Sequence, residues 1–68
     1  MGMRFKPEQI KRLREDLGMT QYDFGKKILQ PPQVISAYER GKMMPSLKVL
    51  TRIIERFGKS FDYFFAND

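Results

Sequence analysis

The fold of this chain is decided by residues 20–45, which read TQYDFGKKILQPPQVISAYERGKMMP. Thr20 with Asp23 three positions later is the pattern of a capped helix start, in which each side chain bonds the backbone amide of the other residue. Pro32 suits the first turn of a second helix, and Gly41 is typical of its end. We therefore predict two short helices joined by a tight connection.

The second of these helices has a polar side that a protein core does not need. At about 100° per residue, Ile35 and Tyr38 share one side, which we expect to be buried. The opposite side carries small and polar residues, namely Gln33, Ser36, Ala37 and Arg40. A helix with such an exposed side is suited to lie against another molecule, most simply the major groove of DNA.

Charge points to the same kind of partner. The 68 residues include 13 Lys and Arg against 8 Asp and Glu, a formal net charge of +5. A basic surplus in so small a protein favours polyanions, because bound cationic side chains release counterions from phosphates. The alternative is a solvated basic surface that only keeps the protein soluble. The length predicts one domain, residues 1–68.

Composition excludes several classes of function. The chain has no Cys and no His, so the commonest nucleophiles, general bases and zinc ligands are missing. The remaining carboxylates and lysines do not cluster, so we predict no enzyme, no metal site, no cofactor and no small-molecule substrate. No apolar run approaches the ~20 residues of a membrane span, and no signal peptide opens the chain, so we expect a cytoplasmic protein without membrane contact.

Two further helices flank the central pair. Pro7 suits the first turn of the earlier one, and Gly18 its end. Pro45-Ser46 starts the later one, and Gly58 ends it. Its expected apolar face comprises Leu47, Leu50, Ile53, Ile54 and Phe57. Ser60 caps a last short helix, FDYFFAND, and no segment alternates long enough to predict a strand. The fold class is therefore all-α, a compact bundle of five helices.

Four segments together resemble one protein family. They are LREDLGMTQ (13–21), IS-x-YE-x-GK (35–42), Pro45-Ser46-Leu47 and LTRIIERFGKSFDYFF (50–65). In this order and spacing the chain resembles the Cro/repressor-type helix-turn-helix domains of bacteria and phages, also called the xenobiotic-response-element family. The resemblance implies the phage-repressor DNA-binding fold, with its helix-turn-helix at about 20–41. It also implies a sequence-specific transcriptional regulator, most simply a repressor, that binds double-stranded DNA as a homodimer on a two-fold operator.

The resemblance assigns roles to individual residues. The positions that meet base edges are Pro32, Gln33, Ser36 and Ala37, of which Gln33 has an amide suited to adenine and Ala37 a methyl suited to thymine. The positions that meet backbone phosphates are Lys11, Gln21, Arg40 and Lys42. Arg14 and Glu39 are expected to form a buried or half-buried ion pair, with two ordinary surface charges as the alternative. Gly25 supplies the small residue where the two central helices approach.

The chain also departs from the family pattern. Leu29 stands where the family usually has Gly, which disfavours a left-handed turn. Pro31 and Pro32 replace a capping Ser or Thr and a polar base-reading side chain, so the cap is missing or displaced to Gln30. Arg40 replaces the usual Asn. The two prolines and the reduced set of base-reading groups support the alternative function, a protein-interaction module such as an antitoxin or adaptor with the same fold.

The C-terminal segment FDYFF has four aromatic residues within five positions. From helical spacing we expect Phe61 and Phe64 to fill the space beneath the preceding helix. Tyr63 and Phe65 would then remain partly exposed and form the homodimer interface, because small proteins rarely leave such a patch uncovered. The alternative is that all four aromatic side chains pack inward.

Overall fold

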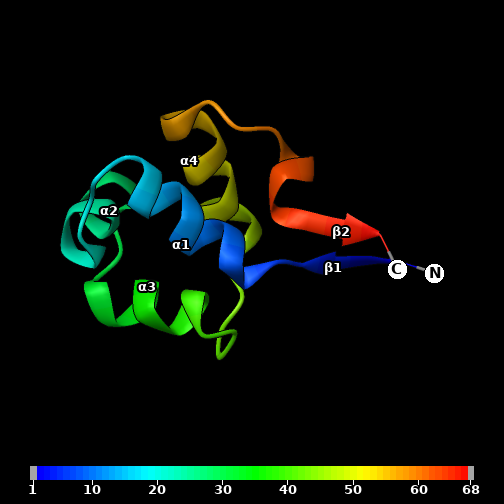
Figure 1. Cartoon of the computed structure of the whole chain (residues 1–68), viewed down its shortest axis with the longest axis horizontal. Helices are drawn as coiled ribbons and strands as arrows, with labels where there is room; N and C mark the ends of the chain where they lie inside the picture. The colour runs from blue at the N-terminus through cyan, green and yellow to red at the C-terminus, as the bar shows by residue number, and fades with distance from the viewer. Residues whose placement is uncertain (1, 68) are drawn as a thin grey trace.

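The computed structural model describes residues 2–67. Four α-helices surround the core, and the two ends of the chain run side by side as short strands (Figure 1). In chain order the elements are β1 (Met3–Phe5), α1 (Pro7–Asp16), α2 (Gln21–Ile28), α3 (Pro32–Glu39), α4 (Leu47–Phe57), the 3-10 helix η1 (Phe61–Phe64) and β2 (Phe65–Asn67). Among the described residues no helix has the length and apolar character required to cross a bilayer.

Local signals define the helix ends as predicted. The Thr20 hydroxyl accepts a hydrogen bond from the Asp23 backbone amide at 3.0 Å, and the Asp23 carboxylate accepts one from the Thr20 amide at 3.3 Å. Ser46 caps α4 through the Val49 amide. Gly58 ends α4 in the left-handed conformation, with φ of 66°. The boundaries of α1 to α4 therefore follow from short sequence patterns.

The core lies where the four α-helices meet. Its buried apolar members are Ile10, Leu13, Phe24, Ile28, Ile35, Tyr38, Val49, Leu50, Ile53 and Phe64. Helix α3 contributes Ile35 and Tyr38, the two residues predicted to face inward. Phe24 stacks on Phe57 with ring centroids 4.7 Å apart, which joins α2 to α4. Because α3 needs only one side for this core, its opposite side is free for other contacts.

The connection between α2 and α3 is tight and strained. Leu29 adopts the left-handed conformation, with φ of 61° and ψ of 42°, although it is not glycine. This backbone conformation costs about 1–2 kcal/mol for a residue with a Cβ atom. The next residue then turns back, and the Gln30 amide donates to the Gly25 carbonyl at 2.9 Å. Leu was expected to disfavour a left-handed turn at this position. The turn forms nevertheless, and the cost of the conformation remains.

Gly25 is required by the same turn. A Cβ atom at this position would collide with the Gln30 carbonyl oxygen, and it would lie 3.3 Å from Ile35 Cγ1 of α3. The predicted close approach is therefore present, but the tightest contact comes from the connection rather than from α3. Alanine does not fit here without a shift of the backbone.

The start of α3 has no side-chain cap. Pro31 occupies the N-cap position with φ of −71° and ψ of 158°, and Pro32 is the first helical residue. The cap is thus missing, as one predicted alternative had it, and it is not displaced to Gln30. Two successive prolines fix the entry angle of the chain, because their rings restrict φ. They also leave no backbone donor at either position.

The C-terminal end differs from the prediction. The expected fifth helix is only the 3-10 turn η1, followed by β2, so the described chain has four α-helices and two strands. Strand β1 pairs antiparallel with β2 in the register Met3 with Asn67 and Phe5 with Phe65. Strands of three residues are too short to show alternation, and their pairing joins opposite ends of the chain. Periodicity along the sequence therefore could not indicate them.

Two positions expected to be buried are exposed instead. Phe61 is 41% exposed and stacks on Phe65 at 4.3 Å between ring centroids, whereas Phe64 is fully buried. A 3-10 turn followed by a strand orients side chains differently from an α-helix, so the expectation from helical spacing is wrong for Phe61. Leu47 is 75% exposed, and Val49 is buried in its place. Leu47 is the first residue of α4 and projects beyond the core.

Candidate nucleic-acid interface

An ion pair joins the helix-turn-helix unit, formed by α2 and α3, to α1. Arg14 of α1 donates through Nε to Glu39 Oε2 at 2.7 Å and through Nη2 to Oε1 at 3.1 Å. The two side chains are 13% and 6% exposed. The third arm of the guanidinium, Nη1, donates to the Met19 carbonyl at 3.0 Å. Arg14 therefore fixes the end of α3 and the loop before α2 at the same time.

The pKa values of Arg14 and of the nearby Tyr38 are both raised. The hydrogen bond to Glu39 raises the pKa of the Arg14 guanidinium above its usual value, although burial acts in the opposite direction. Burial also raises the pKa of the Tyr38 hydroxyl. Both groups thus keep their protons at neutral pH, and the inner side of α3 holds one fixed cation–anion pair beside a neutral phenol.

The same carboxylate holds a predicted phosphate-contacting residue. Gln21 Nε2 donates to Glu39 Oε1 at 3.2 Å, so the side chain at the start of α2 is tied to the end of α3. Gln21 lies in the first turn of α2, where backbone amides lack intrahelical partners. An anion at this point would meet both the helix N-terminus and an amide side chain of fixed orientation.

The outward side of α3 forms a shallow hollow with α2. Its lining residues are Gln21, Pro32, Gln33, Ser36 and Arg40. Gln33 and Arg40 are exposed, whereas Ser36 is half-buried. Arg40 folds back along its own helix, with Nε 3.4 Å from the Ser36 carbonyl. The structure therefore brings together in one hollow five of the eight residues predicted for DNA contact.

The other three predicted contact residues do not line this hollow. Ala37 is half-buried on α3 between Gln33 and Arg40, and Lys42 follows in the loop that leaves α3. The Lys42 amide donates to the Ala37 carbonyl at 2.9 Å, which holds the start of this loop against the helix and leaves the lysine side chain exposed. Lys11 is exposed on α1, a separate element.

The two residues predicted for the dimer interface are engaged within the chain. Tyr63 packs edge-on against Phe64, and Lys59 lies over its ring at 4.8 Å. Phe65 lies between Phe61 and Phe5, with ring centroids 4.3 and 5.7 Å away. Both residues are half-buried. Each keeps part of its surface exposed, and Phe61 extends that surface.

The sequence did not predict one contact between α4 and the end of α2. Arg52 of α4 donates through Nη1 to the Ile28 carbonyl at 3.4 Å, at the C-terminal end of α2. A cation at this end of a helix is favoured by the helix dipole. Arg52 lies on the expected polar side of α4, but no sequence pattern indicates which helix end it would meet. No group of three potential metal ligands exists among residues 2–67.

Comparison with known proteins gives a consistent result. A family model described as Helix-turn-helix matches residues 10–64. Endothelial differentiation-related factor 1 of Rattus norvegicus is 43% identical over 49 residues, covering 72% of this chain and 33% of that protein. Vegetative-specific protein H7 of Dictyostelium discoideum is 43% identical over 47 residues, covering 69% of this chain and 45% of that protein. The chain thus spans about a third to a half of the length of these relatives.

A solved structure with a similar fold is the P22 c2 repressor protein in complex with a synthetic operator. The TM-score is 0.80 at 27% sequence identity, and the match covers 88% of this chain and 91% of that one. The similar region includes the four α-helices described above, because so large a share of both chains is superposed.

Proposed function

This chain belongs to the helix-turn-helix family, in its Cro/repressor-type group, and we propose that it is a sequence-specific DNA-binding regulator of transcription. Helix α3 enters the major groove of double-stranded DNA, and Gln33 reads a base through its amide. Beside Gln33, three further residues contact base edges, Ala37 through its methyl group and Pro32 and Ser36 through their shape.

The observation that carries this proposal is the polar side of α3 that the core does not use. Ile35 and Tyr38 are the buried residues that connect α3 to the core, while Arg14 and Glu39 hold its end in place. Gln33 takes no part in this packing and is exposed. An exposed amide on a rigidly held helix suits bidentate recognition of adenine N6 and N7. The likeness to a repressor solved with its operator supports the same orientation.

Phosphate contacts would then position the domain. Gln21 stands at the N-terminus of α2 with its amide held by Glu39, so it is prepared for a phosphate on one side of the groove. Arg40 and Lys42 lie at the end of α3 and in the loop beyond it, and Lys11 adds a charge from α1. These contacts carry no sequence information but make binding dependent on salt.

We further propose that the protein acts as a repressor and as a homodimer on a two-fold operator. The interface would use Tyr63 and Phe65, because both rings are only half-buried and exposed Phe61 stacks on Phe65. An isologous contact there would place two copies of α3 about 34 Å apart, one helical turn of DNA.

The test is selection of bound duplexes from a random pool, first with the wild type and then with Gln33→Ala. The wild type should enrich one two-fold site. The variant should lose preference at one base of each half-site, by about 1–3 kcal/mol of discrimination, because one bidentate contact is gone. Lys26→Ala, on the exposed side of α2, is the control and should keep the full preference. Equal weakening on all sequences would exclude Gln33 as a base reader.

One observation favours a second function, a protein-interaction module. Met43, Met44 and Leu47 are exposed apolar residues in the loop after α3 and at the start of α4. Pro31 and Pro32 also offer no backbone or side-chain donor to a base. Titration of a random duplex across salt distinguishes the two functions. A steep fall of log affinity with log salt supports DNA binding, and no binding at low salt supports the protein-interaction module.

A further inference from the structure

Much of the positive charge of this chain lies away from the α3 hollow. Four cations occur on α4 and the adjoining end of α2, and we call them the α4 basic surface: Lys27, Lys48, Arg52 and Arg56. The DNA-contacting surface proposed above has three, Lys11, Arg40 and Lys42. In Figure 1, α4 is at the top and α3 at the bottom, so the helix that carries Lys48, Arg52 and Arg56 lies across the molecule from α3.

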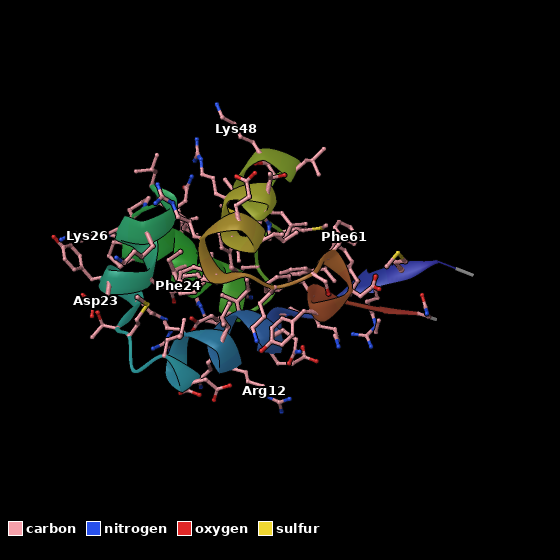
Figure 2. All side chains as sticks on the ribbon, turned by 90° about the horizontal axis from the view of Figure 1, so that it is seen from above. Arg12, Asp23, Phe24, Lys26, Lys48 and Phe61 are labelled. Carbon is pink, nitrogen blue, oxygen red and sulfur yellow. The ribbon has the colours of Figure 1, made fainter. Side chains whose placement is uncertain are left out.

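One contact within this surface joins α4 to the end of α2. Arg52 donates to the Ile28 carbonyl, which places its guanidinium where α4 meets the end of α2. Lys27 directly precedes Ile28 in that last turn of α2, where it is exposed. Figure 2, seen from above, shows Lys48 pointing outward from α4 into solvent.

The charge of this surface is not balanced within the protein. None of the four cations forms an ion pair with a carboxylate among residues 2–67. Asp23, four positions before Lys27, is used in the cap of α2. Glu55 is the one carboxylate in α4. A row of unpaired cations attracts a polyanion, because each phosphate it neutralises releases a counterion.

The spacing of the row fits a nucleic-acid backbone. Lys48, Arg52 and Arg56 follow one another at intervals of four residues, so they lie on one side of α4 over about 12 Å at 1.5 Å per residue. One DNA strand carries a phosphate about every 3.4 Å along its axis, so three or four phosphates fall within that length.

We propose that the α4 basic surface binds the phosphate backbone of a second DNA duplex, without sequence preference, while α3 holds the first. The bridging of two duplexes rests on the proposed function of α3, but the second site does not use α3 residues. Arg52 supplies both the junction with α2 and a charge, whereas Lys27, Lys48 and Arg56 supply charge alone. The protein would thereby bring a distant segment of DNA to its operator.

The experiment is capture of a labelled duplex by an immobilised operator duplex in the presence of protein. The operator is the one selected with the wild type. The test variant is Lys48→Gln with Arg56→Gln, and Arg52 is kept because it contacts α2. The matched control is Arg12→Gln with Lys26→Gln, which removes the same charge from exposed positions on α1 and α2. Circular dichroism verifies that both variants fold.

The test variant should capture the second duplex about tenfold more weakly than the control. Its salt slope should be lower by roughly 2 units, at about 0.9 for each phosphate that is no longer neutralised. Binding to the immobilised operator should change equally in both variants. Equal capture by the two variants would overturn the inference, and so would a wild type that binds its operator but captures no second duplex. A wild type that binds duplexes through these residues without any sequence preference would instead overturn the proposed function of α3.

Discussion

The helix-turn-helix unit and the joined chain ends are built in different ways. In the unit, local chemistry specifies helix ends such as the start of α2, at the reciprocal cap of Thr20 and Asp23. In the chain ends, β1 and β2 hold each other through backbone pairing, with Met3 opposite Asn67. One region is fixed by nearby residues, and the other by residues at opposite ends of the sequence.

Because of this difference, the orientation of α3 is more strongly restrained than that of the chain ends. The unit has a buried ion pair, a tight turn and an inward-facing Tyr38, so α3 is held in one orientation. The chain ends have two strands of three residues each and rings packed against one another. A two-stranded sheet of that size is marginal without support from a core. In this chain the support comes from Phe64.

The largest expected effect on stability comes from breaking the ion pair between Arg14 and Glu39. Arg14→Ala leaves the Glu39 carboxylate buried without its cation, and we expect the free energy of unfolding to fall by about 3–5 kcal/mol. Urea denaturation followed by circular dichroism measures it. Arg12→Ala removes an exposed arginine from the same helix and should change stability by less than about 0.5 kcal/mol. Similar losses in both variants would show that Arg14 acts only through general charge.

The next test addresses the chain ends. Phe64 is fully buried in the core, so Phe64→Ala should destabilise the fold by about 3–4 kcal/mol, near the lower end for a buried phenylalanine because the short segment can relax. Phe61→Ala removes an exposed ring of the same type and should cost under about 1 kcal/mol. The same denaturation experiment compares them. Equal losses would mean that Phe61 belongs to the core after all.

The unit could be predicted well from the sequence because its signals are local. The cap at Thr20 and the inward pair Ile35 and Tyr38 follow from spacing within a few residues, as does the cap of the next helix at Ser46. The ion pair of Arg14 with Glu39 required the family resemblance, since no local rule joins residues on different helices. The structure then supplied its geometry, including the hydrogen bond that Glu39 receives from Gln21.

Prediction failed where structure depends on distant pairing or on exact side-chain direction. Helical spacing places Phe61 inward, but the chain forms a 3-10 turn and then pairs with β1, which turns that ring outward. The same spacing puts Leu47 on the apolar face, although it begins α4 at its exposed end. For the candidate site, helical spacing indicated Gln33 and the family resemblance indicated Gln21, but neither indicated the contact of Arg52 with α2.

A smaller effect is expected at the centre of the unit. Gly25→Ala introduces a Cβ atom against the Gln30 carbonyl, a backbone atom that cannot move aside without shifting the turn. Overpacking of this kind costs typically about 1–3 kcal/mol, while alanine regains about 1 kcal/mol of helix propensity. We expect a net loss of stability, measured by thermal denaturation, with Lys26→Ala on the exposed side of α2 as the neutral control. A stabilised Gly25→Ala variant would show that the turn yields freely.

The smallest effect concerns the strained turn itself, and its sign is opposite. Leu29 holds a left-handed conformation that costs a residue with a Cβ atom about 1–2 kcal/mol. Leu29→Gly removes this cost, while the added freedom of the unfolded chain takes back about 0.4–1 kcal/mol. Because Leu29 is 69% exposed, little burial is lost. We expect a net gain below about 1 kcal/mol in the free energy of unfolding, measured by urea denaturation. Leu29→Ala separates the causes, since it removes the side chain but keeps the Cβ atom, and it should bring no gain. Equal stability of the glycine and alanine variants would show that the backbone of this turn is not strained, and that its shape follows from Pro31 and Pro32 alone.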